Sequence, residues 1–346
     1  MTDYFRPLVQ SGPRRPEAAL PLAGGPLWFT EVEHITRSDP RGRILPASEL
    51  PGDVRRDLTG SRPDVAGLSM SAPRIMGILN VTPDSFSDGG QHKVPALAAA
   101  HAGRMIEAGA DIIDIGGEST RPGAETIPTE TEIARVLPAV QAIRSAHPRI
   151  PISIDTRKST VAHAAHVSQA RGIDLINDVS GFTFDRGLSE FAARMDLPVC
   201  VMHAQGDPET MHLDPRYDDV LLDVYDFLAG QIALLVGAGI PRARIVADPG
   251  IGFGKTITHN LAILQNMSLF HALGVPVLLG ASRKGFIGRI TGETVAERRV
   301  AGSVAVALSA VAQGVQIVRV HDVAETRQAL DLWQAVTAGE WHGSGA

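Results

Sequence analysis

The sequence predicts an α/β fold, a (β/α)8 TIM barrel with an appended N-terminal segment, and three observations support this fold class. From Arg74 onward, short apolar runs of strand length alternate with longer stretches of helical periodicity, the pattern of repeated βα units. There are eight such runs, and eight parallel strands close a barrel. Nearly every run is followed by Asn, Asp, Ser or His, which an apolar core alone would not select.

The eight predicted strands are separated by intervals that can hold helices. We place the strands at residues 75–79, 111–115, 152–154, 175–176, 199–202, 245–247, 277–279 and 317–320. One predicted helix covers residues 131–145, where apolar residues recur on one stripe. Thr129 and Glu132 match a capping box at its start. Another, at residues 302–313, is rich enough in Ala and Val to be buried on most sides.

The start of the chain has a different composition. Residues 1–70 are rich in Pro, Gly and Arg, and their only strand-like run is 27–35. Such a composition is typical of irregular segments. We therefore divide the chain into a partly irregular N-terminal extension, residues 1–70, and a barrel, residues 71–340.

Composition also limits the function. With 346 residues and 44% hydrophobic content, the chain can bury a large core without a disulfide or a structural metal. A formal net charge of -6 offers no basic face for nucleic acid. The one cysteine, Cys200, lies in an apolar run and is expected to be a buried core residue, as suits a reducing compartment. No stretch resembles a signal peptide or a membrane span, so we expect a cytoplasmic protein.

The polar residues after the strands indicate one site. They are Asn80, Asp155, Asn177, Asp178, His203, Asp248, Ser282 and His321. In a parallel barrel the carboxyl ends of the strands meet at one mouth, where the active sites of this fold lie. Exits into solvent would favour Lys, Glu and Ser, so the density of Asn, Asp and His favours a site.

Two motifs add basic groups to this mouth. The motif SRK, residues 282–284, follows the seventh run, and RVHD, residues 319–322, forms the eighth run and its exit. Barrels commonly hold a phosphate group here, so Lys284, Arg319 and His321 could converge on an anion. An arginine inside an apolar strand needs an acceptor or a flat ring to stack on.

The remaining motifs leave several readings open. Residues 248–256, DPGIGFGKT, match neither a Walker A loop nor a dinucleotide fingerprint. Loops 80–90 and 116–123 could each be an ordinary surface loop, but together they suggest a closing cover. Asp155 and Asp248 could be a metal pair, an acid/base pair or acceptors for a ring rich in N–H donors. Because no metal-ligand spacing accompanies them, recognition of a heterocycle is favoured.

Eight motifs, in order and spacing, resemble the dihydropteroate synthase family. They are NVTPDSFSDGG, GGESTRPGA, IDTRK, NDVSG, VMHAQG, DPGIGFGK, LLGASRKGFIG and RVHDV. The resemblance covers residues 74–330 and excludes the extension. It implies a pterin-binding barrel that acts as a transferase in folate biosynthesis. Such an enzyme condenses 6-hydroxymethyl-7,8-dihydropterin diphosphate with p-aminobenzoate to give 7,8-dihydropteroate and pyrophosphate.

The resemblance also implies roles for individual residues. The pterin would be bound by Asp155, Asn177, Met202, Asp248, Lys284 and Arg319. The diphosphate would be held by Asn80, Arg319 and His321, with Asn80 as the protein ligand of Mg2+. The p-aminobenzoate pocket and its loops would comprise Phe86, Ser87, Thr120, Arg121, Pro122, Phe253 and Ser282. Catalysis would depend on Lys284, Arg319, His321 and Asp155.

The family further implies a homodimer, formed through the later barrel helices, and a target of sulfonamides. Two alternatives remain: a pterin-dependent methyltransferase and a pterin-binding protein that has lost catalysis. A methyltransferase has no need of SRK and RVHD for a diphosphate, and a silent protein would have a damaged diphosphate site or truncated loops. Both motifs and both loops are intact here, which favours the synthase.

Overall fold

The computed structural model describes residues 3–82, 94–119, 124–206, 211 and 213–340. Five of the predicted site residues, Phe86, Ser87, Thr120, Arg121 and Pro122, lie outside these ranges.

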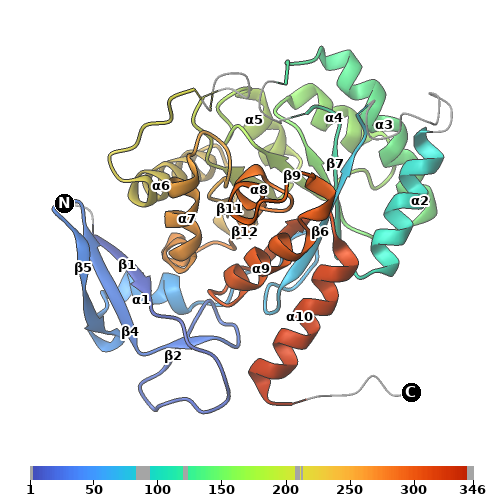
Figure 1. Ribbon diagram of the computed structural model, residues 1–346. Coiled ribbons are helices and arrows are strands. Elements are labelled where there is room, and N and C mark those ends of the chain that lie inside the picture. Colours follow the sequence, from blue (N-terminus) through green and yellow to red (C-terminus); the bar gives the residue numbers. More distant parts are fainter. Residues whose placement is uncertain (1–2, 83–93, 120–123, 207–210, 212, 341–346) are drawn as a thin grey trace.

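Eight parallel strands form the barrel at the centre of the molecule (Figure 1). They are β6 (Arg74–Asn80), β7 (Ile112–Gly116), β8 (Ile152–Asp155), β9 (Leu175–Asp178), β10 (Val199–Met202), β11 (Ile245–Asp248), β12 (Leu278–Leu279) and β13 (Ile317–Val320). Their spatial order is β11-β10-β9-β8-β7-β6-β13-β12. A parallel bridge between Ala247 and Val277 joins the two outer strands. The predicted fold class is therefore confirmed, and each predicted run coincides with a strand.

Helices connect the strands and surround them (Figure 1). They are α2 (Val94–Glu107), α3 (Thr129–Ala146), α4 (Ser159–Val167), α5 (Gly187–Arg194), α6 (Val220–Gly237), α7 (Ile257–Gln265), α8 (Gly285–Thr291), α9 (Val300–Val311) and α10 (Val323–Ala338). Short 3-10 turns occur at η3 (Arg242–Arg244), η4 (Met267–Leu273) and η5 (Ala296–Arg298). The two helices predicted from periodicity correspond to α3 and α9.

The capping box predicted at the start of α3 is wrong. Pro128 is the N-cap residue, and no side chain caps the helix. Glu132 is fully buried and accepts hydrogen bonds from Thr156 Oγ1 at 2.6 Å and from Lys158 Nζ at 2.7 Å. A charge-assisted bond to a lysine is stronger than a bond to the backbone, so the glutamate side chain points to the lysine.

The extension is more regular than its composition indicated. Its strands are β1 (Asp3–Pro7), β2 (Leu20–Pro21), β3 (Trp28–Phe29), β4 (Glu31–Thr36) and β5 (Asp39–Pro46), followed by η1 (Ala47–Glu49) and α1 (Gly52–Thr59). Strands β1, β4 and β5 form an antiparallel sheet. The prediction of one strand-like run was therefore wrong. Strand β5 is mostly exposed and contains Pro and Gly, so it lacks the apolar alternation that marks a strand.

The extension has a small core and packs against the side of the barrel (Figure 1). Tyr4 donates a hydrogen bond to Asp226 of α6 at 2.8 Å. Arg37 pairs with Asp226 at 2.6 Å and with Asp223 at 2.8 Å. Ser268 of η4 donates to the Pro7 carbonyl at 2.9 Å. These contacts hold the extension on α6 and η4.

Helix α6 is the one helix in the described ranges that is long and apolar enough to cross a membrane by length and composition. Its residues Leu222, Leu228 and Ile232 are buried in the main core, and its carboxylates pair with Arg37 of the extension. In this structure α6 is a barrel helix.

Candidate active site

The barrel interior changes from apolar to polar toward the carboxyl ends of the strands. Alternate residues of a strand face the same side. One layer inside the barrel consists of Met76, Ile112, Leu175, Cys200, Val246, Leu278 and Ile317, which form one buried cluster. Two positions further along, the same alternation places Ile78, Asp114, Asn177, Met202, Asp248, Gly280 and Arg319 on the interior side. The polar layer therefore rests on an apolar floor, which includes Cys200 as expected.

Arg319 joins residues from three other strands. Its Nε donates to Asp114 Oδ2 at 2.6 Å, and its Nη2 donates to Asp155 Oδ2 at 2.7 Å. Asn177 Nδ2 donates to the same Asp114 oxygen at 3.2 Å. The structure thus brings together Arg319, Asp155 and Asn177, three of the predicted pterin-binding residues.

Asp114 is the member of this group that sequence reasoning missed. It is fully buried, and among the described residues its Oδ1 has no hydrogen-bond partner. The sequence does contain a signal for it, since Asp114 stands at an inward position of the apolar run IIDIG. A buried charge requires a partner, so such an aspartate indicates a polar site. Its free oxygen is an acceptor for a donor entering the barrel.

A row of aligned residues crosses the neighbouring strands. Asn80, Gly116, Asp155 and Asn177 are register partners on β6, β7, β8 and β9. A side chain at Gly116 would begin 3.5 Å from Asn80 Oδ1 and 3.7 Å from Asp155 Oδ2. The glycine therefore leaves space between these two oxygens.

Asp248 and Lys284 lie on the other side of Arg319. Gly280 separates Asp248 from Arg319, since its missing Cβ would lie 3.7 Å from Asp248 Oδ2 and 3.8 Å from Arg319 Cδ. Asp248 Oδ1 accepts from the Gly250 N–H at 2.7 Å. Lys284 donates to the Ile251 carbonyl, and its Nζ lies 4.3 Å from the centre of the Phe253 ring. Phe253 and Lys284, both predicted, are therefore in contact.

The SRK and RVHD motifs bind each other. Ser282 Oγ accepts from the His321 backbone N–H at 3.1 Å and lies 3.1 Å from His321 Nδ1. Arg283 pairs with both oxygens of Asp322, at 2.5 and 3.1 Å. The loop after β12 and the end of β13 thus form one unit that holds Ser282 and His321 together.

Burial shifts the acidity of this site. Burial raises the pKa of Asp155 to about 7, although Arg319 opposes the shift, and it also raises the pKa of Asp248. Burial lowers the pKa of Lys284 to about 7. Burial alone would lower the pKa of Arg319, but Asp114 and Asp155 raise it. Arg319 is therefore the permanent positive charge of the site, while Asp155 and Lys284 can change charge near neutral pH.

Two of the polar strand-end residues point away from this site. Asp178 and His203 follow the inward positions Asn177 and Met202, so the alternation turns them outward. Asp178 accepts from the N–H groups of Ser180 and Phe182 at 2.7 and 2.8 Å. His203 Nδ1 lies 2.7 Å from Lys255 Nζ. Both residues hold loops rather than line the barrel.

A buried ion network, also missed from the sequence, supports the loops after β7 and β8. Glu118 pairs with Arg157 at 2.9 Å and with Lys158 at 3.1 Å, and Lys158 reaches Glu132 at 2.7 Å. Glu118 Oε1 also accepts from the Ile127 N–H at 2.9 Å. The network therefore ties residues 118 and 127 to the segment that follows Asp155.

Comparison of the sequence with known proteins identifies a family of pterin-binding enzymes. A model of the family described as "Pterin binding enzyme" matches residues 76–321. The dihydropteroate synthase of Neisseria meningitidis serogroup B is 47% identical over 274 residues, covering 78% of this chain and 94% of that protein. The enzyme of Escherichia coli K12 is 45% identical over 273 residues, covering 79% and 95%. The chain belongs to the dihydropteroate synthase family. It is accordingly a transferase.

Solved structures of dihydropteroate synthases share the fold. The Xanthomonas albilineans enzyme with 4-aminobenzoic acid has a TM-score of 0.74 at 46% identity, covering 80% of this chain and 98% of that one. The same enzyme in complex with 7,8-dihydropteroate has a TM-score of 0.71 at 43% identity, covering 80% and 99%. A Yersinia pestis enzyme with a sulfonamide drug complex has a TM-score of 0.72 at 45% identity, covering 78% and 96%. The family match begins at residue 76, after the extension.

Proposed function

We propose that this dihydropteroate synthase joins 6-hydroxymethyl-7,8-dihydropterin diphosphate to p-aminobenzoate at the mouth of the barrel. The observation that carries the proposal is the buried group of Asp114, Asp155, Asn177 and Arg319, in which one aspartate oxygen remains free. A pterin edge is rich in N–H donors, so it needs acceptors of this kind. The reaction itself is inferred from membership of the dihydropteroate synthase family.

The pterin would lie in the polar layer of the barrel. Asp155, Asn177, Asp248 and Lys284 would hydrogen-bond its edge, Arg319 would stack on its face, and Met202 would pack beneath it. In support, Asn177, Met202, Asp248 and Arg319 occupy equivalent inward positions on four strands. We add Asp114 to the proposed pterin-binding residues, because its buried Oδ1 has no hydrogen-bond partner among the described residues.

The diphosphate would lie between β6 and the unit formed by Ser282 and His321. Asn80, Arg319 and His321 would hold it by hydrogen bonds and charge. The described residues contain no cluster of three acidic, histidine or cysteine ligands. As the family resemblance implies, Mg2+ would be held by Asn80 and mainly by phosphate oxygens. When bound, Mg2+ neutralises charge on the leaving diphosphate.

The chemistry follows from a good leaving group and a weak nucleophile. The bond between the pterin methylene carbon and the diphosphate oxygen breaks first, and its electron pair leaves with pyrophosphate. Arg319 and His321 stabilise the departing anion, and the pterin stabilises the carbocation-like carbon. The p-aminobenzoate nitrogen then bonds to this carbon, and its proton passes to the released pyrophosphate.

The p-aminobenzoate would bind beside Phe253, Lys284 and Ser282. Lys284 and Phe253 contact each other, which gives this pocket an aromatic wall and a cation. Phe86, Ser87, Thr120, Arg121 and Pro122 would complete the pocket and exclude water, which would otherwise capture the cation. A sulfonamide would compete for the same pocket.

We further propose a cytoplasmic homodimer formed through α7, α8 and α9. Leu261 is 46% exposed and Ile290 is 55% exposed, and both border a groove lined by Phe286, Ile287 and Val306. Exposed apolar residues around such a groove favour contact with a second copy. Light scattering on the purified wild-type protein should give a molar mass of two chains. The Ile290→Arg variant should give the molar mass of a single chain.

The test is pyrophosphate release from 6-hydroxymethyl-7,8-dihydropterin diphosphate with Mg2+, measured with and without p-aminobenzoate. Release that depends on p-aminobenzoate and yields 7,8-dihydropteroate supports the synthase. Pterin binding without turnover would indicate the catalytically silent alternative. Turnover of methyltetrahydrofolate with a corrinoid acceptor would indicate the methyltransferase.

A further inference from the structure

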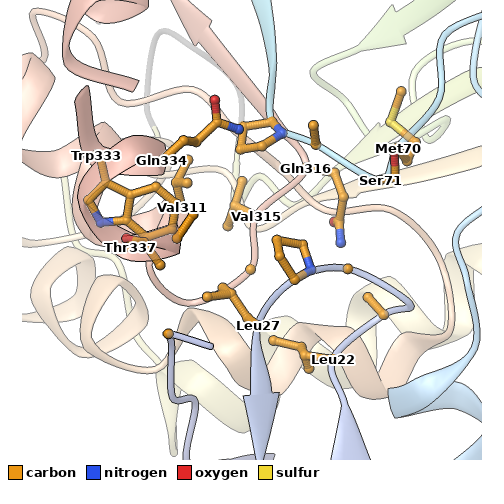
Figure 2. A pocket seen from close by; sticks show the side chains of 18 of the residues that line it. Leu22, Leu27, Met70, Ser71, Val311, Val315, Gln316, Trp333, Gln334 and Thr337 are labelled. Carbon is orange, nitrogen blue, oxygen red and sulfur yellow. The ribbon is translucent and has the colours of Figure 1, made fainter. Parts of the chain in front are cut away.

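A second cavity lies at the opposite end of the barrel, between the barrel and the N-terminal extension (Figure 2). Its volume is about 430 Å³, within the usual range of small-molecule sites. Its walls include Leu22 and Leu27 of the extension, Met70 and Ser71 before β6, Val315 and Gln316 before β13, and Trp333 and Thr337 of α10. No residue assigned above to pterin, diphosphate or p-aminobenzoate lines it.

Gln316 presents a free donor to this cavity. Its side chain is only 5% exposed. Its Oε1 accepts from the Val277 backbone N–H at 2.8 Å, and this bond fixes the orientation of the amide, because an amide NH2 group could not accept it. The Nε2 therefore faces away from Val277, and Figure 2 shows this nitrogen directed into the cavity. Among the described residues Nε2 has no hydrogen-bond partner.

The other walls are mainly apolar and partly flat. Trp333 lines the cavity together with Leu27 and Val315 (Figure 2). An indole face favours stacking with a planar ring. The charged residues of the lining, Arg15 and Glu340, have opposite signs, and both are exposed. The cavity therefore has a neutral buried donor and no buried charge, which disfavours a charged ligand.

We propose that this cavity binds a small, neutral, planar molecule whose carbonyl oxygen or ring nitrogen accepts a hydrogen bond from Gln316 Nε2. The ring system stacks on Trp333, and the extension closes the site through Leu22 and Leu27. The site lies away from the mouth of the barrel and does not depend on the reaction proposed there.

The test uses 9-fluorenone and fluorene, two flat tricycles that differ in the presence of one carbonyl oxygen. Binding to the full-length protein is measured by quenching of tryptophan fluorescence, and the bound ketone is located by crystallography. We expect one saturable site for fluorenone with an affinity about fivefold higher than that of fluorene, the size of one hydrogen bond to a buried donor.

Three variants distinguish the proposed hydrogen bond from nonspecific hydrophobic binding. Gln316→Glu keeps an oxygen for the Val277 N–H and replaces the free donor with an acceptor, so at pH 8 fluorenone should bind at least tenfold more weakly and its preference over fluorene should be lost. Gln169→Glu makes the same change in the exposed turn after α4 and should bind as the wild type does. Thr337→Trp fills the cavity from the end of α10 and should abolish binding of both compounds.

Several results would overturn the proposal. One is the absence of saturable binding, which would mean that the cavity holds only water and is not a ligand site. Another is equal fluorenone affinity in the wild type and in folded Gln316→Glu. A third is electron density for fluorenone in the mouth of the barrel and not beside Gln316. If Gln316→Glu fails to fold, retained binding in Thr337→Trp contradicts the proposal by itself.

Discussion

Arg319 and Asp155 are 164 positions apart in the chain, yet they form an ion pair of 2.7 Å across the carboxyl end of the barrel. Asp114, on the strand between β6 and β8, holds the same guanidinium from its other edge at 2.6 Å. The arginine is therefore oriented by two carboxylates before any substrate enters. Such preorganisation reduces the reorganisation that the reaction requires.

Asp155→Asn tests this arrangement. The amide has the shape of the carboxylate but removes its charge and one acceptor, so we expect kcat/KM to fall by about 10²-fold or more. The measurement is the rate of pyrophosphate release by a folded variant. Asp331→Asn changes an exposed carboxylate of α10 and is the control, which should retain wild-type activity. If the Asp155→Asn enzyme keeps the wild-type rate, Asp155 does not contribute to catalysis.

Lys284→Ala tests the contribution of the amine beside Phe253. Loss of its charge and of its hydrogen bond should lower kcat/KM by about 10²-fold or more. Arg289→Ala changes an exposed cation on the same helix, α8, and should leave the rate unchanged. Rates near the wild-type value in Lys284→Ala would exclude Lys284 from the mechanism.

The sequence predicted the barrel well because its strands alternate with helices along the chain. It also located the mouth, since Asn80, Asp155, Asn177, Asp248 and His321 follow apolar runs and parallel strands end together. The alternation of facing within each strand carried further information that the prediction did not use. It separates Asn177 from Asp178 and Met202 from His203, and only the first residue of each pair faces the interior.

Other features depend on partners that are distant in the sequence. Asp114 was hidden inside a strand, and its role appears only when β13 brings Arg319 to it. Glu132 fits a capping box locally, but a lysine from the next βα unit binds its side chain. Strand β5 of the extension is mostly exposed, so pairing with β4 and not an apolar pattern defines it.

His203 predicts a dependence of stability on pH. Burial and the nearby Lys255 lower its pKa to about 2, whereas an unfolded histidine titrates near 6.5. Between these values the unfolded chain binds one more proton, so this contribution to stability is lost as the pH falls below about 6.5.

The variant His203→Gln lacks this titration. Its free energy of unfolding should approach that of the wild type as the pH falls, by about 1.4 kcal/mol per pH unit. Urea denaturation between pH 7 and pH 4 measures the difference. His271, whose burial lowers its pKa to about 3, should give the same sign in His271→Gln. A difference that stays constant with pH would contradict the neutral state assigned to His203.

Lys158 tests the network that supports the loops after β7 and β8. The residue is buried, and it pairs with two buried glutamates. Lys158→Met leaves Glu132 without its cation, so we expect the free energy of unfolding to fall by about 3–5 kcal/mol, the usual effect of breaking a buried pair.

A second substitution separates the lost charge pair from the lost packing. Glu132→Met in addition to Lys158→Met removes the unpaired carboxylate, so the double variant should be less destabilised than the sum of the single variants. Arg216→Met breaks the exposed pair with Asp214 and should have no measurable effect. If Lys158→Met is as stable as the wild type, the network does not hold these loops, and Glu118 must be positioned by Arg157 and the Ile127 N–H alone.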